Sequence, residues 1–353
     1  MKDELKEFLA QVVAIPGISG QEGRVALFLK QWFEPYVQEI RMDSLGNLVM
    51  CRRGEGPEPR PRLLLTAHMD EIGFLVSKIE IGGFLRFTAV GGIDARILLG
   101  QEVLVLGRSD VPGVIGAKPP HLLAEEERKK APRLEDLFID VGLPGEQLEN
   151  VVQIGDPIVL KRDPQALSGE SWTGKALDDR AGLAALYVCL RSLERVRVPA
   201  DIFVVATVQE ELGTRGATVC TFGLIPDIGI AVDVGFGEMP GLPEEDTIAM
   251  GEGPAIALGP NIHPCIGQDL IRLAKEHHIP HQIEVAPGPT GTDARAIQIS
   301  RGGVAAGLLS IPLRYMHTPV EVVQMQDIIS TGRLLALFAG QLDRAYLEGM
   351  RCY

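Results

Sequence analysis

This sequence contains little cysteine, no basic region and no long apolar run. The five cysteines form no Cys-x-x-Cys pair and are odd in number, so we expect a reducing compartment rather than a disulfide framework. No apolar run approaches the roughly 20 residues that cross a bilayer. Charges at Lys2, Asp3, Glu4 and Glu7 leave no uninterrupted apolar region near the start, so we expect no signal peptide. The net charge of −13, without a basic patch, argues against nucleic-acid binding. We therefore expect a cytoplasmic protein that engages neither membranes nor nucleic acids.

What the chain does have is the length and the aliphatic content of a two-domain α/β protein. Its 353 residues are 46% apolar but only 5% aromatic, which suits cores packed from aliphatic side chains. In the second half, helical spacing of apolar residues at about 179–193, 269–278 and 325–343 alternates with apolar runs typical of buried strands. This alternation predicts a largely parallel sheet flanked by helices.

Residues 71–163 have a different pattern. Short β-like runs recur there between glycines and prolines, and no long helix is indicated. We predict an inserted small β-domain, a barrel or a sandwich, at 71–163, and a discontinuous main domain made of 1–70 and 164–353. The alternative is an elaborated hairpin region within a single domain.

Histidines and carboxylates follow the apolar runs of the predicted sheet. These are His68 and Asp70 after residues 63–67, Glu210 and Glu211 after 202–208, Asp233 after 228–232, and His317 just beyond 307–311. Open α/β sheets place ligands at the carboxyl ends of their strands, so we expect these side chains to meet at one edge. A set of histidines and carboxylates of this kind is that of a two-metal hydrolase.

Each of these elements has a structural alternative when it is taken alone. A His-x-Asp such as 68–70 is more often a hydrogen-bonded structural histidine than a metal ligand. Asp178 and Asp179 lie at a loop-to-helix junction, where one can cap the helix while the other bridges two metals. Of Glu210 and Glu211, one would be a ligand and the other a general base, and the spacing alone does not say which. The alternative for that pair is a solvated strand end.

Four stretches of the sequence resemble the M42 family of dinuclear metallo-aminopeptidases. They are AHMDEIGF at 67–74, GKALDDR at 174–180, QEE at 209–211 and RYMHTPVE at 314–321. The match runs in order over essentially the whole chain, and VIGAKPPH at 114–121 inside the insertion also looks like this family. Together these motifs are highly specific.

The resemblance implies a ligand set. His68 and Asp233 would hold one metal, Glu211 and His317 the other, and Asp178 would bridge the two. Zinc or cobalt suits a mixed nitrogen and oxygen site, with manganese as an alternative, because ligand chemistry alone does not choose among them.

The resemblance also implies a reaction. Two divalent metals would share a bridging water, Glu210 would act as the general base, and Asp70 would orient His68. The substrates would be short peptides that lose their N-terminal amino acids. One departure from the family pattern lies at 290–295, where Thr290 and Arg295 replace small residues, which puts the side-chain preference in doubt if this loop borders the substrate pocket.

The family resemblance further implies that the insertion is a PDZ-like dimerisation domain and that dimers assemble into a homo-oligomer, often a dodecamer. Other functions remain open at this point. A two-metal carboxypeptidase or an N-acyl amino-acid deacylase would use the same ligands. A glycanase, which needs only two carboxylates, would leave His68 and His317 unused. A non-enzymatic, metal-stabilised assembly protein would have a closed coordination shell.

Overall fold

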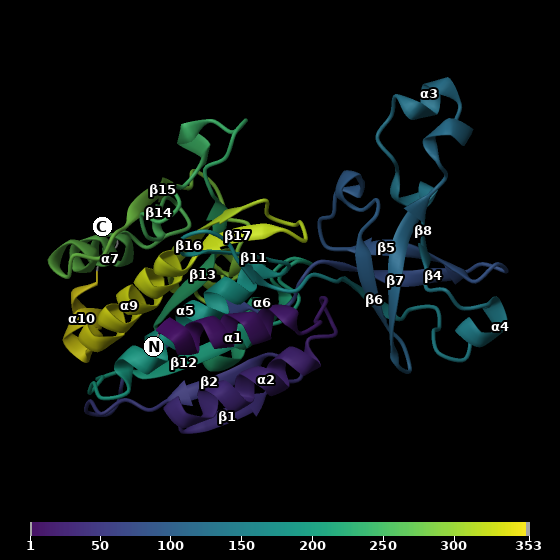
Figure 1. Cartoon of the computed structure of the whole chain (residues 1–353). Coiled ribbons are helices and arrows are strands. Elements are labelled where there is room, and N and C mark those ends of the chain that lie inside the picture. Colours follow the sequence, from purple (N-terminus) through teal and green to yellow (C-terminus); the bar gives the residue numbers. More distant parts are fainter. Residues whose placement is uncertain (1, 351–353) are drawn as a thin grey trace.

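The structure is a computed structural model that describes residues 2–350. Within them, a mixed sheet of eleven strands organises the larger part of the molecule (Figure 1). Its order is β1-β2-β12-β3-β13-β16-β17-β11-β10, and β14 and β15 extend it beside β16. The strands are β1 (Glu39–Met42), β2 (Leu48–Arg52), β3 (Arg62–His68), β10 (Gln165–Ala166), β11 (Ser171–Gly174), β12 (Asp201–Thr207), β13 (Ile228–Phe236), β14 (Ala255–Leu258), β15 (Gln282–Val285), β16 (Ala305–Arg314) and β17 (Glu321–Gln324).

Helices cover both faces of this sheet, which is why its central strands are almost wholly apolar. Successive side chains of β3 alternate between the two faces: Leu63 and Leu65 pack with α1, α2, α5 and α9, whereas Leu64 packs with α6 and α8. The helices are α1 (Lys2–Ala14), α2 (Gly23–Phe33), α5 (Leu177–Leu193), α6 (Arg215–Leu224), α7 (Pro264–Glu276), α8 (Asp293–Gln298), α9 (Met325–Gln341) and α10 (Arg344–Gly349).

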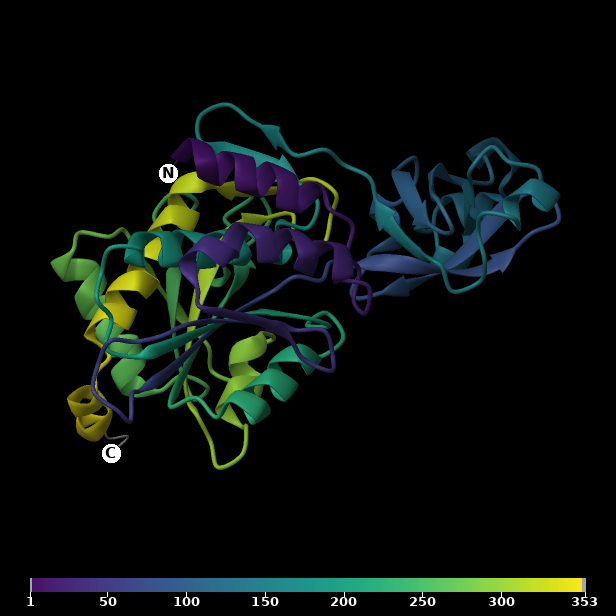
Figure 2. The same ribbon diagram turned by 90° about the horizontal axis from the view of Figure 1, so that it is seen from below.

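The inserted segment forms a closed six-stranded barrel that stands to one side of the sheet domain (Figures 1 and 2). It has its own core, to which Phe74, Val103, Ile139 and Ile158 contribute. The predicted α/β fold with an inserted β-barrel is therefore confirmed, whereas the domain joins at 70/71 and 163/164 stay a prediction. The barrel elements are β4 (Gly73–Ile79), β5 (Phe84–Val90), β6 (Glu102–Leu106), β7 (Asp110–Ala117), β8 (Leu137–Asp140) and β9 (Pro157–Leu160), with short helices α3 (Glu125–Arg128) and α4 (Gly145–Leu148) between strands.

The barrel also touches the sheet domain through specific contacts. Arg24 of α2 forms two hydrogen bonds with Asp110 of β7, at 2.7 and 2.8 Å. Ile18 forms a bridge with Glu71, and a Cβ on Gly73 would come within 2.2 Å of the Ile18 side chain. A larger residue at position 73 would therefore push the two parts apart.

Several predicted boundaries were wrong. The helix expected from Asp269 begins at Pro264, because proline at the first helical turn has its φ already fixed. The last predicted helix, 325–343, ends at Gln341, and Asp343 instead caps α10. β13 continues to Phe236, so Asp233 lies within this strand rather than after it. Among residues 2–350, no helix is long and apolar enough to cross a membrane.

Candidate active site

The candidate site lies at the carboxyl ends of neighbouring parallel strands. β12, β3, β13 and β16 lie side by side in this order, and each of the three pairings is parallel. His68 is the last residue of β3, Asp233 lies in β13, Glu210 and Glu211 follow β12, and His317 follows β16. Since parallel strands end at the same edge, residues far apart in the sequence meet there.

Asp178 reaches the same place from the start of α5. Asp178 and Asp179 have non-helical backbone angles and are joined by a cis peptide bond. The Asp179 carboxylate accepts a hydrogen bond from the backbone N–H of Gly182 at 2.9 Å, as a capping residue does. The Asp178 side chain is thereby left to face the strand ends.

Two groups of potential ligands share Asp178. In the first, His68 Nε2 lies 3.0 Å from Asp178 Oδ1 and 4.0 Å from Asp233 Oδ1. In the second, His317 Nε2 lies 3.2 Å from Asp178 Oδ2 and 3.1 Å from Glu211 Oε1. Within each group the ligand atoms all lie within 4.8 Å of one another. The two oxygens of one carboxylate therefore face two adjacent positions, each suited to a cation.

The residues present fit two divalent cations. Imidazole and carboxylate are donors to zinc, cobalt and manganese. His68, Asp178 and Asp233 are buried, while Glu211 and His317 are half-buried, so the second group is the more open. The shared carboxylate would bridge the two ions, since each of its oxygens already lies in one group.

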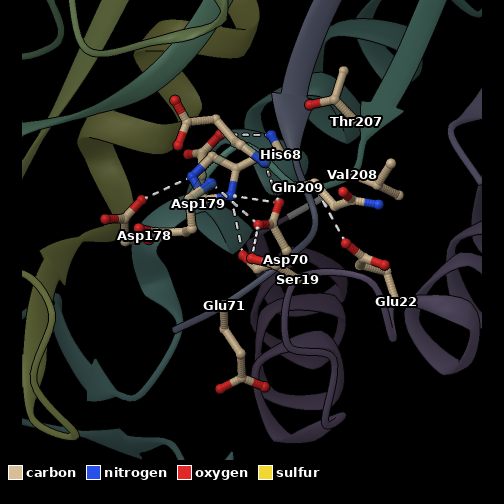
Figure 3. Close-up of polar contacts among 12 residues, drawn as sticks. Ser19, Glu22, His68, Asp70, Glu71, Asp178, Asp179, Thr207, Val208 and Gln209 are labelled. Atoms are coloured by element: carbon tan, nitrogen blue, oxygen red, sulfur yellow. Dashed lines mark hydrogen bonds and ion pairs between the residues drawn. The ribbon is translucent and has the colours of Figure 1, made fainter. Parts of the chain in front are cut away.

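Asp70 lies beside His68 and also contacts the Glu210-Glu211 pair. His68 Nδ1 lies 3.0 Å from the backbone carbonyl oxygen of Asp70 and 3.5 Å from its Oδ1. The Asp70 carboxylate accepts a hydrogen bond from Ser19 Oγ at 2.6 Å (Figure 3). It also accepts hydrogen bonds from the backbone N–H groups of Glu210 and Glu211 at 3.0 and 3.2 Å. Asp70 thus holds the backbone of the Glu210-Glu211 pair in place beside His68.

Glu321 is a site residue that the sequence reasoning missed. It is only 2% exposed, and its carboxylate accepts hydrogen bonds from the backbone N–H of Asp178 at 3.1 Å and of His317 at 2.8 Å. One buried side chain therefore fixes two potential ligands that come from different elements. Its only signal in the sequence was its place at the end of the RYMHTPVE stretch.

Gly92 was also missed, and nothing in its sequence context indicates a role. Its backbone carbonyl oxygen lies 2.8 Å from His317 Nδ1, although Gly92 follows β5 in the inserted barrel. A Cβ at this position would stand 3.2 Å from the same ring nitrogen. A histidine that ligates a metal commonly donates its second N–H to a carbonyl or carboxylate, and Gly92 supplies that acceptor for His317.

The site holds more buried negative charge than its histidines balance. Burial raises the pKa of Glu210 to about 9, against the lowering effect of His68. Burial likewise raises the pKa of Asp233 well above its ordinary value. For His317 burial acts downward, but hydrogen bonds with Asp178 and Glu211 raise its pKa to about 11. Cations bound between these groups would supply the missing positive charge.

A cleft of about 580 Å³ opens in front of the site. Asp178, Glu210, Glu211, Asp233 and His317 all line it. The loop that departs from the family pattern lines it as well, through residues 290–292, whereas position 295 does not. Substrate entering this cleft would meet the ligands and the candidate base on one side.

The remaining histidines lie elsewhere. None of them is among the described residues that line the cleft. Burial lowers the pKa of His263, and His277 lines a separate groove on the sheet domain. The five histidines outside the site are His121, His263, His277, His278 and His281.

An open α/β sheet with a cluster of carboxylates and histidines at its carboxyl edge, facing a cleft, is the architecture of a metallohydrolase. The family model described as M42 glutamyl aminopeptidase matches residues 46–334. The chain belongs to this family, and it is a hydrolase of peptide bonds, an aminopeptidase.

Known proteins resemble the chain over nearly its full length. Lysyl aminopeptidase of Pyrococcus furiosus is 35% identical over 334 residues, which cover 93% of this chain and 94% of the relative. The structure of the TET aminopeptidase from Thaumarchaeota archaeon SCGC AB-539-E09 has a TM-score of 0.93 at 34% identity and covers 99% of both chains. The Pyrococcus horikoshii TET1 peptidase, which can assemble into a tetrahedron or a large octahedral shell, has a TM-score of 0.85 at 32% identity and covers 96% of this chain and 100% of its own.

Proposed function

We propose that the protein removes N-terminal amino acids from short peptides with two divalent cations, zinc or cobalt or alternatively manganese, bound at the carboxyl edge of its sheet. The observation that carries this proposal is the position of Asp178, whose two oxygens face two ligand groups. His68 and Asp233 would hold one ion, Glu211 and His317 the other, and Asp178 both. When bound, the ions would act as Lewis acids and lower the pKa of a water molecule.

Side chains of the protein would then accept and deliver the proton of the water. Glu210 would accept the proton of the attacking water at its carboxylate and deliver it to the leaving amine. Its pKa of about 9 belongs to a buried carboxyl crowded by other acids, and added positive charge lowers such a value toward the range of a general base. The Asp70 carboxylate, which accepts a hydrogen bond from the backbone N–H of Glu210 at 3.0 Å, would keep this base in position. The backbone carbonyl oxygen of Asp70 would fix the orientation of the His68 ring.

Hydrolysis of matched substrates tests the function. The protein is treated with a chelator and then assayed on aminoacyl-anilides, free and N-acetylated, before and after zinc, cobalt or manganese is added. We expect metal-dependent cleavage of the free-amine substrates only. Cleavage of the acetylated twins would indicate a deacylase, and cleavage of C-terminal residues from peptides would indicate a carboxypeptidase. Hydrolysis of a glycan by the metal-free protein would favour the glycanase function. No activity on any of these substrates would favour a non-enzymatic assembly protein.

We further propose a closed homo-oligomer, built from dimers up to a dodecamer, with the barrel as the dimerisation domain. The barrel carries large apolar side chains that are exposed in the single chain, among them Ile81, Leu99, Val114 and Leu122. A partner copy that covered them would remove apolar surface from water. Light scattering of the purified protein gives the test, and a monomer at micromolar concentration would contradict the proposal.

A further inference from the structure

Besides the proposed ligands and base, the carboxylates that line the cleft are those of Glu245, Asp246 and Glu284, and of these only Glu284 is not exposed. Glu284 of β15 is half-buried and lines the cleft together with Asp233 and Ser310. Ser310 Oγ donates a hydrogen bond to Glu284 Oε2 at 2.7 Å. In the part of the chain that the structure describes, no lysine, arginine or histidine forms an ion pair with Glu284. It is therefore a carboxylate held in place with its charge unmatched.

The sheet register places Glu284 close to the site but outside the ligand set. Ser310 of β16 is the direct neighbour of Asp233 of β13, one strand spacing or about 4.8 Å away. Glu284 lies on the other side of Ser310, because β14 stands between β16 and β15. Ala255 and Gln282 continue the row of Asp233 and Ser310, and Glu284 is two residues further along β15, with its carboxylate turned back to Ser310. A substrate side chain that extends from the reacting end past Ser310 would approach this carboxylate.

Apolar side chains form part of the wall of the same cleft. They suit the methylene chain of a long side chain, while the carboxylate suits a charged tip. Among the described lining residues none is lysine or arginine, and the His317 ring is engaged on both nitrogens by Asp178, Glu211 and Gly92. The apolar lining residues include Phe236, Ile248, Ile283, Val285, Leu308 and Met316.

We propose that this cleft selects peptides whose N-terminal residue is lysine or arginine, and that Glu284 binds the cationic tip. The inference rests on the proposed aminopeptidase function, since it takes the cleft as the pocket for the first residue. An acidic side chain would be repelled by Glu284, and an apolar one would remove water from Glu284 without offering it a partner. A long side chain with a cationic tip matches both the apolar part of the cleft and the carboxylate of Glu284.

The test compares lysine with norleucine, whose side chain is the same aliphatic chain without the terminal ammonium. With the zinc-loaded protein, we expect kcat/KM for the lysyl-anilide to exceed that for the norleucyl-anilide by about tenfold or more. Glu284→Gln should bring this ratio close to one by slowing lysine cleavage, and it should not slow norleucine cleavage, because the neutral amide loses its water at a smaller cost than the carboxylate. Glu245→Gln, which changes an exposed carboxylate at the rim of the same cleft, is the matched control and should reduce the ratio by less than about threefold.

Binding separates the two proposals. Calorimetry measures L-lysinamide and L-norleucinamide, which share the free α-amine and differ only at the tip. One outcome is that no substrate is hydrolysed, but lysinamide binds more tightly than norleucinamide and Glu284→Gln abolishes this difference. That outcome would contradict the proposed aminopeptidase function and support the proposed cation pocket. Hydrolysis of all free-amine substrates without a preference for lysine overturns the pocket and leaves the aminopeptidase standing. Equal loss of lysine and norleucine cleavage in Glu284→Gln would make Glu284 a structural residue and would also overturn it.

Discussion

Glu321→Gln should weaken metal binding without unfolding the protein. The Glu321 carboxylate accepts one backbone N–H from Asp178 and one from His317. Glutamine keeps the shape but offers only one carbonyl oxygen, so one of these N–H groups would face an NH₂ donor in a buried place. Leaving such a group unpaired costs about 1–3 kcal/mol, and we expect divalent cations to bind roughly 10- to 100-fold more weakly.

Competition with a chromogenic chelator measures this affinity, and activity against metal concentration gives a second readout. If Glu321 only positions ligands, saturating metal should restore most of kcat. Asp327→Asn is the matched control, because Asp327 is another buried carboxylate that accepts two backbone N–H groups, those of Gly251 and Gly253 at 2.8 Å each, away from the site. It should lower the melting temperature without changing metal affinity. Metal affinity of Glu321→Gln within twofold of wild type would refute the positioning role.

Three further predictions follow from the same geometry. Glu210→Gln should reduce kcat by about 10²–10⁴ while metal affinity, measured by the same competition, stays within threefold; near-normal turnover would remove Glu210 from the base role. The metal-free protein should lose stability as the pH rises from about 4.5 toward 9, because the folded state raises the pKa of Glu210 from 4.5 to about 9 and so holds its proton more tightly than the unfolded chain. Thermal melts of chelated and zinc-loaded protein at pH 6 and pH 8.5 check this, and a chelated protein that melts higher at pH 8.5 would contradict it. Arg24→Ala should change the free energy of unfolding by less than about 1 kcal/mol, since its ion pair with Asp110 is exposed; denaturant titration of the variant would show a larger loss if this contact held the barrel in place.

The strands and the residues that follow them could be predicted because both signals are local. The apolar composition of a run such as residues 63–67 predicts a buried strand. If such strands are parallel, their carboxyl ends meet at one edge, which predicts that His68 lies close to Asp233. The predicted residues are found together at one sheet edge. The α/β fold and the inserted barrel were predictable for the same reason.

The supporting contacts could not be predicted in this way. Gly92 and His317 are 225 positions apart, and Asp178 and Glu321 are 143 apart, so both contacts depend on how domains and elements dock. One helix start was also missed because two signals competed. Asp269 is a residue type that commonly caps a helix, but Pro264, five residues earlier, already fixes the backbone angle φ in the first turn. Where two residue types both favour a helix start, the sequence alone does not say which of them is used.

The contact between Gly92 and His317 has a thermodynamic consequence. If the docked barrel makes His317 a better ligand by a certain free energy, then a cation on His317 must hold the barrel in its docked position by the same free energy, because linkage is reciprocal. Hydrogen exchange in the loop that joins β5 to the rest of the barrel would then slow when metal is added. The inserted domain would in this way report on the occupancy of a site to which it contributes one carbonyl oxygen.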